Sequence, residues 1–525
     1  MPISLYISIE IVKTIQVYFI SQDVEMYYAS YDTPCVLKTW NISDDLGQIE
    51  YVFSDKTGTL TQNIMEFQKC SVHGVSYGEG ITEAQQGAAT REGKGDTLDP
   101  HEINEKLSKL KTQMVNTMER TFKNRYFQSE KLTLVSPKFA EDLADRSNEQ
   151  RAHLVAFFRA LALCHSVLAD RPEPQKEPYI INYKAESPDE AALVSAARDA
   201  GFPFLGKSKD TLEIEVMGQS EKYTFLKQLE FNSTRKRMSV VLRCPDGRLI
   251  LYCKGADSVI YERLTKDHDQ ALKDQTSKDM EMFANNVLRT LCISYRYLEE
   301  EEYLNWCRIW DTASNAIENR EEELDKANAL IEHSLLILGA TALEDKLQEG
   351  VPEAIEMLHR AGFKLWILTG MFFFSSALDA YGSYPDFYAI CLGDKLQTAI
   401  EIGYSCNLLK NDMDLMILSA STPEQTRAQL EAGLNKIASV LGPPTWDLRK
   451  RGFVPGAQAS FAVVIDGETL HHALTLELKP LFLNLGTQCE TVVCCRVSPA
   501  QKALTVNLVS SLLIPAFNAF FFFVN

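Results

Sequence analysis

An apolar stretch followed by a turn-forming octapeptide constrains this chain more than any other feature. Residues 49–53 (IEYVF) have the composition of a buried parallel strand. The octapeptide 54–61 (SDKTGTLT) follows, so Asp55 falls at the carboxyl end of that strand, where open α/β sheets place their ligands. A carboxylate there can attack a γ-phosphate, and the glycine of the octapeptide permits a tight turn. Thr57 offers a hydroxyl group to phosphate or metal, and Lys56 can offset phosphate charge.

Composition narrows the class of protein. A length of 525 residues predicts about three or four domains. The formal net charge of −18 argues against a nucleic-acid binder, which needs a basic face. The 12 cysteines contain no C-x-x-C pair, which is typical of reduced cysteines in a cytosolic protein. Cys164 and His165 have no partners at metal-ligand spacing, so we expect both in the core.

The first stretch of the chain, residues 1–20, is apolar apart from Glu10, Lys13 and Gln16. About 20 such residues can cross a bilayer as a helix. Without further motifs, the stretch predicts either a marginal membrane helix or a buried one. It has no basic n-region or cleavage site, so we expect no signal peptide.

Three segments in the middle of the chain carry residue types that suit a nucleotide. Ser187-Pro188 followed by two acids predicts a helix start. In 231–241 (FNSTRKRMSVV), Phe231 can stack on a base and Lys236 can meet phosphate, although a charged hairpin explains the segment equally well. In 251–257 (LYCKGAD), alternating apolar residues end in a Lys-Gly turn that can present Lys254 to phosphates.

Later segments predict a return to the first fold. Residues 335–342 read as a buried strand, 353–360 as an amphipathic helix and 363–370 as another strand that ends in Thr369-Gly370. A strand, helix and strand in this order predict a right-handed parallel crossover.

The octapeptide, together with 183–193 (YKAESPDEAAL), 251–257 and 492–502 (VVCCRVSPAQK), resembles the motifs of P-type ATPases. Pro2-Ile3-Ser4-Leu5 resembles the fourth transmembrane helix of their phospholipid-translocating (flippase) subfamily, in particular its fungal plasma-membrane subgroup. The resemblance covers most of residues 1–509. It implies an α/β fold: a Rossmann-like HAD-type phosphorylation domain, split by an inserted α+β nucleotide-binding domain, with one N-terminal membrane helix. The implied domains are a transmembrane helix (1–25), the stalk and first part of the phosphorylation domain (26–66), the nucleotide-binding domain (67–334), the second part of the phosphorylation domain (335–509) and an aberrant tail (510–525).

The resemblance also implies the site residues, with Asp55 as the catalytic nucleophile. The residues implied for nucleotide and phosphate are Asp55, Lys56, Thr57, Glu186, Phe231, Ser233, Lys236, Lys254, Arg289, Thr290, Thr369, Gly370, Asp394, Arg496 and Lys502. Asp55 and Thr57 are the implied Mg²⁺ ligands. Related phosphatases have a second Asp where this chain has Thr57, so we expect a phosphoenzyme that persists.

The implied function is ATP-dependent phospholipid translocation through an aspartyl-phosphate, by an enzyme that uses Mg²⁺ and takes ATP as substrate. The implied partners are a phospholipid substrate and the membrane, with an accessory subunit of the flippase type as a further candidate and no nucleic acid. The implied location is an integral membrane protein of the plasma membrane or an endomembrane, with a cytosolic catalytic head.

The sequence departs from the family pattern in two places. Residues 371–393 separate Thr369-Gly370 from Asp394-Lys395, and removing them restores the pattern. After residue 509 the family's Mg²⁺-binding loop and further membrane helices do not follow, so we expect this chain alone not to transport. Two alternatives stay open: a soluble nucleotide-binding module without turnover, and a cation-pumping P-type ATPase. Ile3 disfavours the second, because cation pumps place an ion-binding Glu directly after the proline.

Overall fold

The computed structural model describes residues 3–38, 49–80, 82, 85, 100–172, 175–232, 235–286, 288–316, 319–370, 396–441, 460–513 and 522–524. The predictions for Pro2, Ser233, Asp394 and the segment 371–393 lie outside these residues. The chain divides into two compact units. The first contains Met1–Asp55, Glu356–Leu368 and Met413–Asn525, and the second contains Lys56–Ile355 and Thr369–Asp412. Each unit is described by itself.

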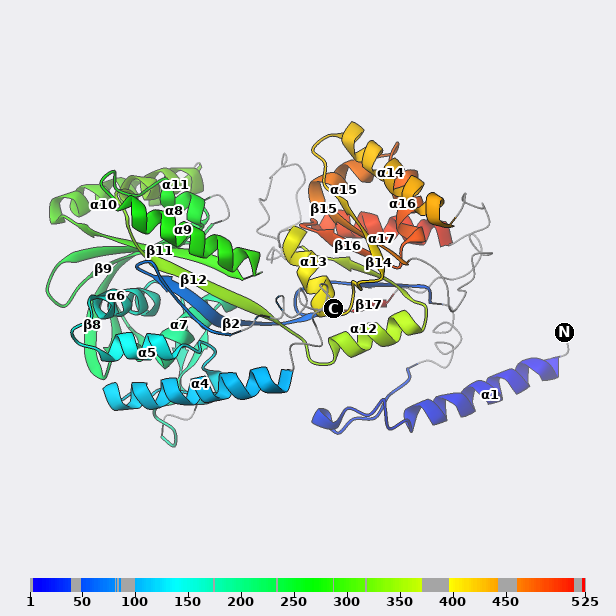
Figure 1. Ribbon diagram of the computed structural model, residues 1–525, viewed down its shortest axis with the longest axis horizontal. Helices are drawn as coiled ribbons and strands as arrows, with labels where there is room; N and C mark the ends of the chain where they lie inside the picture. Colours follow the sequence, from blue (N-terminus) through cyan, green and yellow to red (C-terminus); the bar gives the residue numbers. More distant parts are fainter. Residues whose placement is uncertain are drawn as a thin grey trace. The chain divides into compact units, whose positions relative to one another are not determined.

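The first unit is built on a parallel sheet whose spatial order is β14-β15-β16-β13-β1-β17 (Figure 1). Its strands are β1 (Tyr51–Ser54), β13 (Lys364–Leu368), β14 (Met413–Leu418), β15 (Ser460–Asp466), β16 (Thr491–Cys495) and β17 (Phe522–Val524). After β13 the chain crosses to β14 at the far edge and returns through β15 to β16, beside β13. The carboxyl ends of β1, β13 and β16 therefore lie next to one another. The parallel crossover predicted between 335–342 and 363–370 is wrong, because the first of these segments pairs antiparallel in the second unit. Open α/β sheets bind ligands at such a change of strand order.

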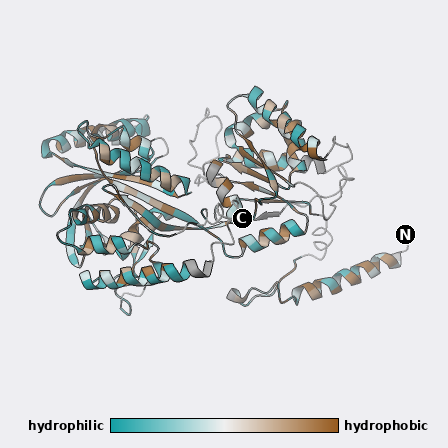
Figure 2. Ribbon diagram, in the orientation of Figure 1, coloured by the Kyte–Doolittle hydropathy of each residue, from teal (hydrophilic) through white to brown (hydrophobic). Residues whose placement is uncertain are grey.

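Helices cover this sheet because its strands are apolar on both faces (Figure 2). They are α14 (Pro423–Leu441), α15 (Gly467–Ala473), α16 (Lys479–Gln488) and α17 (Pro499–Leu513). Helix α12 (Val351–Arg360) precedes β13 in the chain and is divided between the two units after Ile355. Trp366 of β13 is fully buried, with its ring 5.6 Å from Phe53 and 6.0 Å from Phe482. Phe53 of β1 is thus fixed in the core, two positions before Asp55.

The N-terminal segment forms helix α1 (Ile3–Ser21), followed by a short 3₁₀ turn at Ala29–Tyr31. The helix predicted at the start of the chain is therefore present, with Glu10 and Lys13 along it. The resemblance implies a membrane span here, yet none of the helices in the described ranges is both long enough and apolar enough to cross a bilayer.

The second unit is built on a nine-stranded sheet with the order β3-β2-β12-β11-β10-β9-β8-β7-β6, in which each pair of neighbouring strands is antiparallel. Its strands are β2 (Thr61–Val72), β3 (Val75–Tyr77), β6 (Phe204–Ser208), β7 (Thr211–Val216), β8 (Gln219–Leu229), β9 (Arg237–Arg243), β10 (Leu249–Gly255), β11 (Arg289–Leu298) and β12 (Leu336–Leu347), with a separate pair β4 (Leu168–Asp170) and β5 (Asn182–Lys184). Its helices are α4 (Pro100–Thr121), α5 (Pro137–Ala144), α6 (Glu149–Leu163), α7 (Pro188–Asp199), α8 (Asp257–Tyr261), α9 (Gln270–Asn285), α10 (Glu300–Ser314), α11 (Arg320–Ile331) and α13 (Leu396–Ser405), with a 3₁₀ turn at Ser129–Lys131.

Two cores lie on opposite faces of this sheet. In β10, Ile250 and Tyr252 belong to the core that includes helix α6, whereas Leu251 and Cys253 belong to the core that includes Trp306 of α10. Alternate residues of a strand point to opposite faces, so β10 is apolar throughout because both faces are covered. The same arrangement explains its complete burial.

One strand prediction is wrong. The sequence places the strand at 335–342 in the parallel fold, whereas β12 pairs antiparallel with β2 and β11 in the second unit. An apolar run fits either buried sheet, and only the pairing with residues about 270 positions earlier in the chain, such as Thr341 with Cys70, decides between them.

Candidate functional site

Asp55 lies directly after β1, at the carboxyl end of the parallel sheet. Its carboxylate forms an ion pair with Lys502 and accepts a hydrogen bond from the Lys502 ammonium, with 2.6 Å between Oδ2 and Nζ. The side chain of Asp55 is 11% exposed and that of Lys502 is 17% exposed, so both remain accessible to a small ligand. A partly buried carboxylate beside a cation at a strand end is suited to phosphate chemistry.

Helix α17 positions Lys502 through its first turn. Ser498 and Gln501 form a capping box: the Gln501 backbone N–H donates to Ser498 Oγ at 3.3 Å, and the Ser498 N–H donates to Gln501 Oε1 at 2.9 Å. Gln501 Nε2 also donates to the Gly467 carbonyl at 2.8 Å. The start of α17 is thereby tied to the end of β15, and Lys502 follows at once.

Arg496 is brought to the same edge of the sheet by close backbone packing. It follows β16, has a φ of 56° and is exposed. Its carbonyl oxygen lies 2.2 Å from the place that a Cβ on Gly467 would occupy. A residue with a side chain would not fit at 467, so this glycine is needed for the approach of the two strand ends.

The turn after Asp55 closes on itself. The carbonyl of Lys56 accepts from Leu60 at 2.9 Å and from Thr61 at 3.1 Å, and Gly58 has a φ of 75°. Lys56 was expected to face phosphate; its side chain is 2% exposed and its ammonium lies 4.0 Å from the Asp345 carboxylate. Thr57 is half-buried.

Thr369 and Gly370 follow β13, the strand adjacent to β1. Thr369 is 4% exposed, and its hydroxyl oxygen has no hydrogen-bond partner within the described part of the chain. A buried hydroxyl group without a partner is costly, and a phosphate oxygen is one group that could satisfy it.

The second unit gathers the predicted nucleotide residues at one end of four neighbouring strands. Register places Leu229, Ser239, Cys253 and Ser294 in one row across β8, β9, β10 and β11. Beyond that row, at the same end of the sheet, come Phe231, Lys236, Lys254, Arg289 and Thr290. Phe231 is 49% exposed, and Glu186 is exposed just before α7.

Lys254 is held by an acid that the sequence prediction did not include. Its ammonium lies 2.5 Å from Glu190 Oε1, and Glu190 also accepts from the backbone N–H of Ser166 at 3.0 Å and from its hydroxyl group. Burial raises the pKa of the Glu190 carboxyl, but Lys254 and Ser166 outweigh it, so the pKa lies below its ordinary value. A bound phosphate would compete with Glu190 for Lys254.

His165 is in the core beside this pair, as the sequence predicts. Its Nδ1 accepts from the backbone N–H of Val167 at 3.1 Å, so Nε2 carries the proton and donates to the Ala162 carbonyl at 2.9 Å. Burial and the nearby positive charge of Lys254 lower the pKa of His165 to about 4. The ring is therefore neutral at pH 7.

Arg289 belongs to a chain of alternating charges. It lies 3.3 Å from Asp189 of α7 and 3.8 Å from Asp345, which in turn faces Lys56. Asp189 and Asp345, like Glu190, were missed by the sequence prediction. Asp189 and Glu190 are the acids of the first turn of α7, and Asp345 lies near the end of the apolar run of β12. Their places at a helix start and near the end of an apolar strand are the sequence features that could have identified them.

The donor set fits the group that the resemblance implies. Mg²⁺ prefers oxygen ligands, and the Asp55 carboxylate and the Thr57 hydroxyl are such ligands. Within the described ranges, no group of three or more His, Cys, Asp or Glu residues is arranged to hold a metal ion. Few protein ligands are expected for Mg²⁺ bound together with a nucleotide, because phosphate oxygens and water complete its coordination.

Comparisons with known proteins show which proteins this chain is similar to. Residues 153–350 match the family model described as "P-type ATPase, cytoplasmic domain N". The chain is 47% identical over 520 residues to phospholipid-transporting ATPase DNF1 of Chaetomium thermophilum, covering 97% of this chain and 32% of the relative. It is 44% identical over 536 residues to phospholipid-transporting ATPase DNF2 of Saccharomyces cerevisiae (98% and 31%). It is 39% identical over 522 residues to phospholipid-transporting ATPase 10 of Arabidopsis thaliana (97% and 40%).

The match to the family model and the identities of 39–47% along 97–98% of the chain show that it belongs to the P-type ATPase family. Within the family, it is similar to proteins named phospholipid-transporting ATPases. The chain spans about a third of the length of the curated relatives that it matches. The resemblance predicted from the motifs is thus confirmed, and so is the mixed α/β fold.

Proposed function

We propose that this chain supplies the nucleotide-binding and phosphorylation steps of an ATP-dependent phospholipid translocase. The observation that carries the proposal is the pairing of Asp55 with Lys502 at the carboxyl end of β1. The names of the relatives, all phospholipid-transporting ATPases, support the substrate class. In the translocase the parallel sheet of the first unit, with the helices packed on it, belongs to the phosphorylation domain, and the second unit is the nucleotide-binding domain.

In the proposed reaction, an Asp55 carboxylate oxygen attacks the γ-phosphorus of ATP. A bond forms between that oxygen and phosphorus, and the bond from the γ-phosphorus to the bridging oxygen breaks. ADP leaves with the electron pair, and Asp55 becomes an aspartyl-phosphate. Lys502 keeps the carboxylate oriented and then faces the transferred phosphoryl charge. Mg²⁺, held by Asp55 and Thr57, would neutralise charge on the phosphates when bound.

Lys254 and Arg289 bind the phosphates of ATP before transfer, and Phe231 offers an exposed ring to the base. Lys254 then exchanges Glu190 for phosphate. Because Thr57 cannot act as the general base that hydrolysis needs, the aspartyl-phosphate persists and couples to movement of lipid in the complete protein.

Phosphate labelling tests the proposal. With [γ-³²P]ATP and Mg²⁺, the chain should incorporate acid-stable, hydroxylamine-sensitive label that Asp55→Asn abolishes. Asp414→Asn is a matched control, because Asp414 pairs with Lys436 at the same 2.6 Å in the same unit, away from the carboxyl edge. Label that survives in Asp55→Asn would refute the proposed nucleophile.

Two further results separate the alternatives. ATP binding that is lost in Lys254→Met, with no label in the parent chain, would identify a nucleotide-binding module without turnover. Label that requires a particular transported cation would instead support a cation pump.

A further inference from the structure

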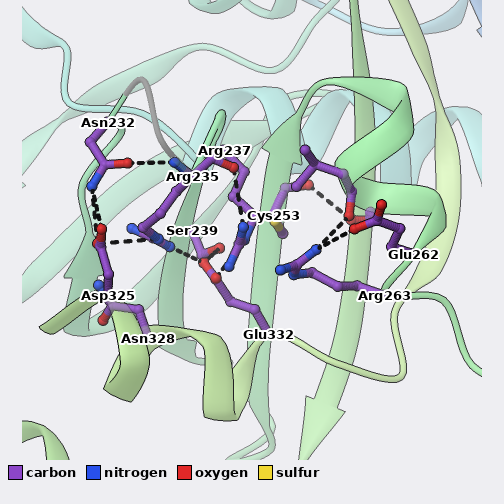
Figure 3. Close-up of polar contacts among 12 residues, drawn as sticks. Asn232, Arg235, Arg237, Ser239, Cys253, Glu262, Arg263, Asp325, Asn328 and Glu332 are labelled. Carbon is purple, nitrogen blue, oxygen red and sulfur yellow. Dashed lines mark hydrogen bonds and ion pairs between the residues drawn. The ribbon is translucent and has the colours of Figure 1, made fainter. Parts of the chain in front are cut away.

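A cluster of charged and polar side chains links the segment between β8 and β9 to the end of helix α11 (Figure 3). We define this arginine cluster by the residues Asn232, Arg235, Arg237, Ser239, Asp325 and Glu332. Its members come from the segment between β8 and β9, from the start of β9, and from α11 and the residue that follows it. Their contacts join parts of the chain that are about 95 residues apart.

Glu332 is the centre of the cluster. It is 0% exposed, and its carboxylate accepts from Arg237 Nε at 2.6 Å, from Ser239 Oγ at 2.6 Å and from Arg235 Nη2. Arg235 and Arg237 are themselves 5% and 3% exposed. Removing three charges from water is costly, so these groups are expected to serve a purpose other than stability.

The two arginines extend this contact to the backbone around Phe231 and Lys236. Arg235 donates through Nη1 to the Glu230 carbonyl at 2.7 Å, and Arg237 donates through Nη1 to the Arg235 carbonyl at 3.1 Å. The backbone on either side of the predicted base-stacking and phosphate-binding residues is therefore anchored to a single carboxylate.

The anchored backbone has little freedom of its own. Lys236 has a φ of 51°, a conformation that residues other than glycine seldom adopt. Its carbonyl accepts from Ala256 at 3.1 Å, and its N–H donates to the Asn232 carbonyl at 2.9 Å. Asp325 adds a second anchor, because both of its carboxylate oxygens accept from Asn232 Nδ2 at 3.0 Å. Backbone strain of this kind persists only where the surroundings enforce it.

We propose that Glu332 is a positioning residue for nucleotide binding: through Arg235 and Arg237 it holds Phe231 and Lys236 in the conformation that receives ATP. The inference rests on the proposed function, because it assumes that ATP binds at this end of the sheet. Glu332 lies outside every nucleotide motif in the sequence, so the sequence alone does not indicate this role.

The test measures the Kd for MgATP of the full chain by isothermal titration calorimetry. Glu332→Gln keeps the shape of the side chain and removes its charge. If the binding conformation then falls to about a tenth of the population, the Kd rises about tenfold. At saturating ATP, the maximal phosphorylation of Asp55 should stay at the parent level, because the chemistry at Asp55 is unchanged.

The matched control is Asp199→Asn, which removes a carboxylate from an equally buried pair in the same unit. Arg198 and Asp199 are both 1% exposed and 2.8 Å apart. Asp199→Asn should leave the Kd within about twofold of the parent. If Glu332→Gln does not fold, Asp325→Asn decides, because Asp325 is 27% exposed and easier to replace; it should raise the Kd about threefold.

Each outcome has one meaning. A parent chain that binds no ATP overturns the proposed function, and this inference with it. A parent chain whose affinity depends on Lys254, but is equal in Glu332→Gln and Asp199→Asn, overturns only the inference. A weaker Kd in Glu332→Gln with unchanged maximal label supports it, and a loss of maximal label with unchanged Kd contradicts it.

Discussion

Protonation of His165 should destabilise the second unit as the pH falls, and His165→Gln should remove most of that effect. In the native state Nδ1 of His165 accepts a hydrogen bond from the Val167 N–H, so a proton on Nδ1 must break this bond. The added charge would also lie beside the Lys254 ammonium. Gln cannot titrate and can keep one of the two hydrogen bonds.

The magnitude follows from the two pKa values. Burial and Lys254 lower the pKa of His165 from 6.5 to about 4 in the folded protein. Between these values the unfolded chain binds more protons than the folded one, so the free energy of unfolding falls as the pH is lowered from 6.5 towards 4. Linkage gives a loss of about 2 kcal/mol between pH 7 and pH 5 from this residue.

Urea denaturation at pH 7 and pH 5 measures this loss, followed by tryptophan fluorescence, to which Trp306 and Trp310 of the second unit contribute. The difference between the two pH values should shrink by about 2 kcal/mol in His165→Gln. It should be unchanged in His471→Gln, which alters an exposed histidine of α15. An equal pH dependence in the parent and in His165→Gln would refute the reasoning.

Three other predictions concern the carboxyl edge of the parallel sheet and the turn that follows Asp55. Gly467→Ala should lower the free energy of unfolding by about 1–3 kcal/mol, because the new Cβ would lie 2.2 Å from the Arg496 carbonyl. Urea denaturation measures this change, and an unchanged midpoint would show that the two strand ends can separate freely. Lys502→Met should reduce the initial rate of ³²P labelling about a hundredfold with an unchanged Kd for ATP, because it removes the cation 2.6 Å from Asp55. Labelling at the full rate would mean that Lys502 has no part in the transfer. Chelation of Mg²⁺ by EDTA should abolish labelling and added Mg²⁺ should restore it, whereas label formed without any divalent ion would exclude Asp55 and Thr57 as Mg²⁺ ligands.

The local elements of the site could be read from the sequence. Asp55 after an apolar strand, the helix that begins at Pro188 and the strand that contains Lys254 are all present, because each depends on residues a few positions apart. The turn predicted at Lys254-Gly255 is instead the end of that strand. The two halves of the parallel sheet could also be expected, because strand and helix alternate there.

The partners of the charged residues could not be predicted. Lys56 was expected to face phosphate but lies beside Asp345, and Lys254 is held by Glu190. The strand predicted at 335–342 was assigned to the parallel fold, but β12 pairs with β2 in the antiparallel sheet. These outcomes depend on contacts between residues 64 to about 290 positions apart, which periodicity and propensity do not encode.

Local chemistry was therefore determined by the sequence alone: an acid at a strand end, a tight turn after it, and cations beside glycine. The tertiary structure decided which charges meet. It placed Lys502 against Asp55, across 447 positions of the chain, and enclosed Glu332 between two arginines. The physical reason is that burial and Coulomb energy depend on distance in space, and only the folded chain sets that distance.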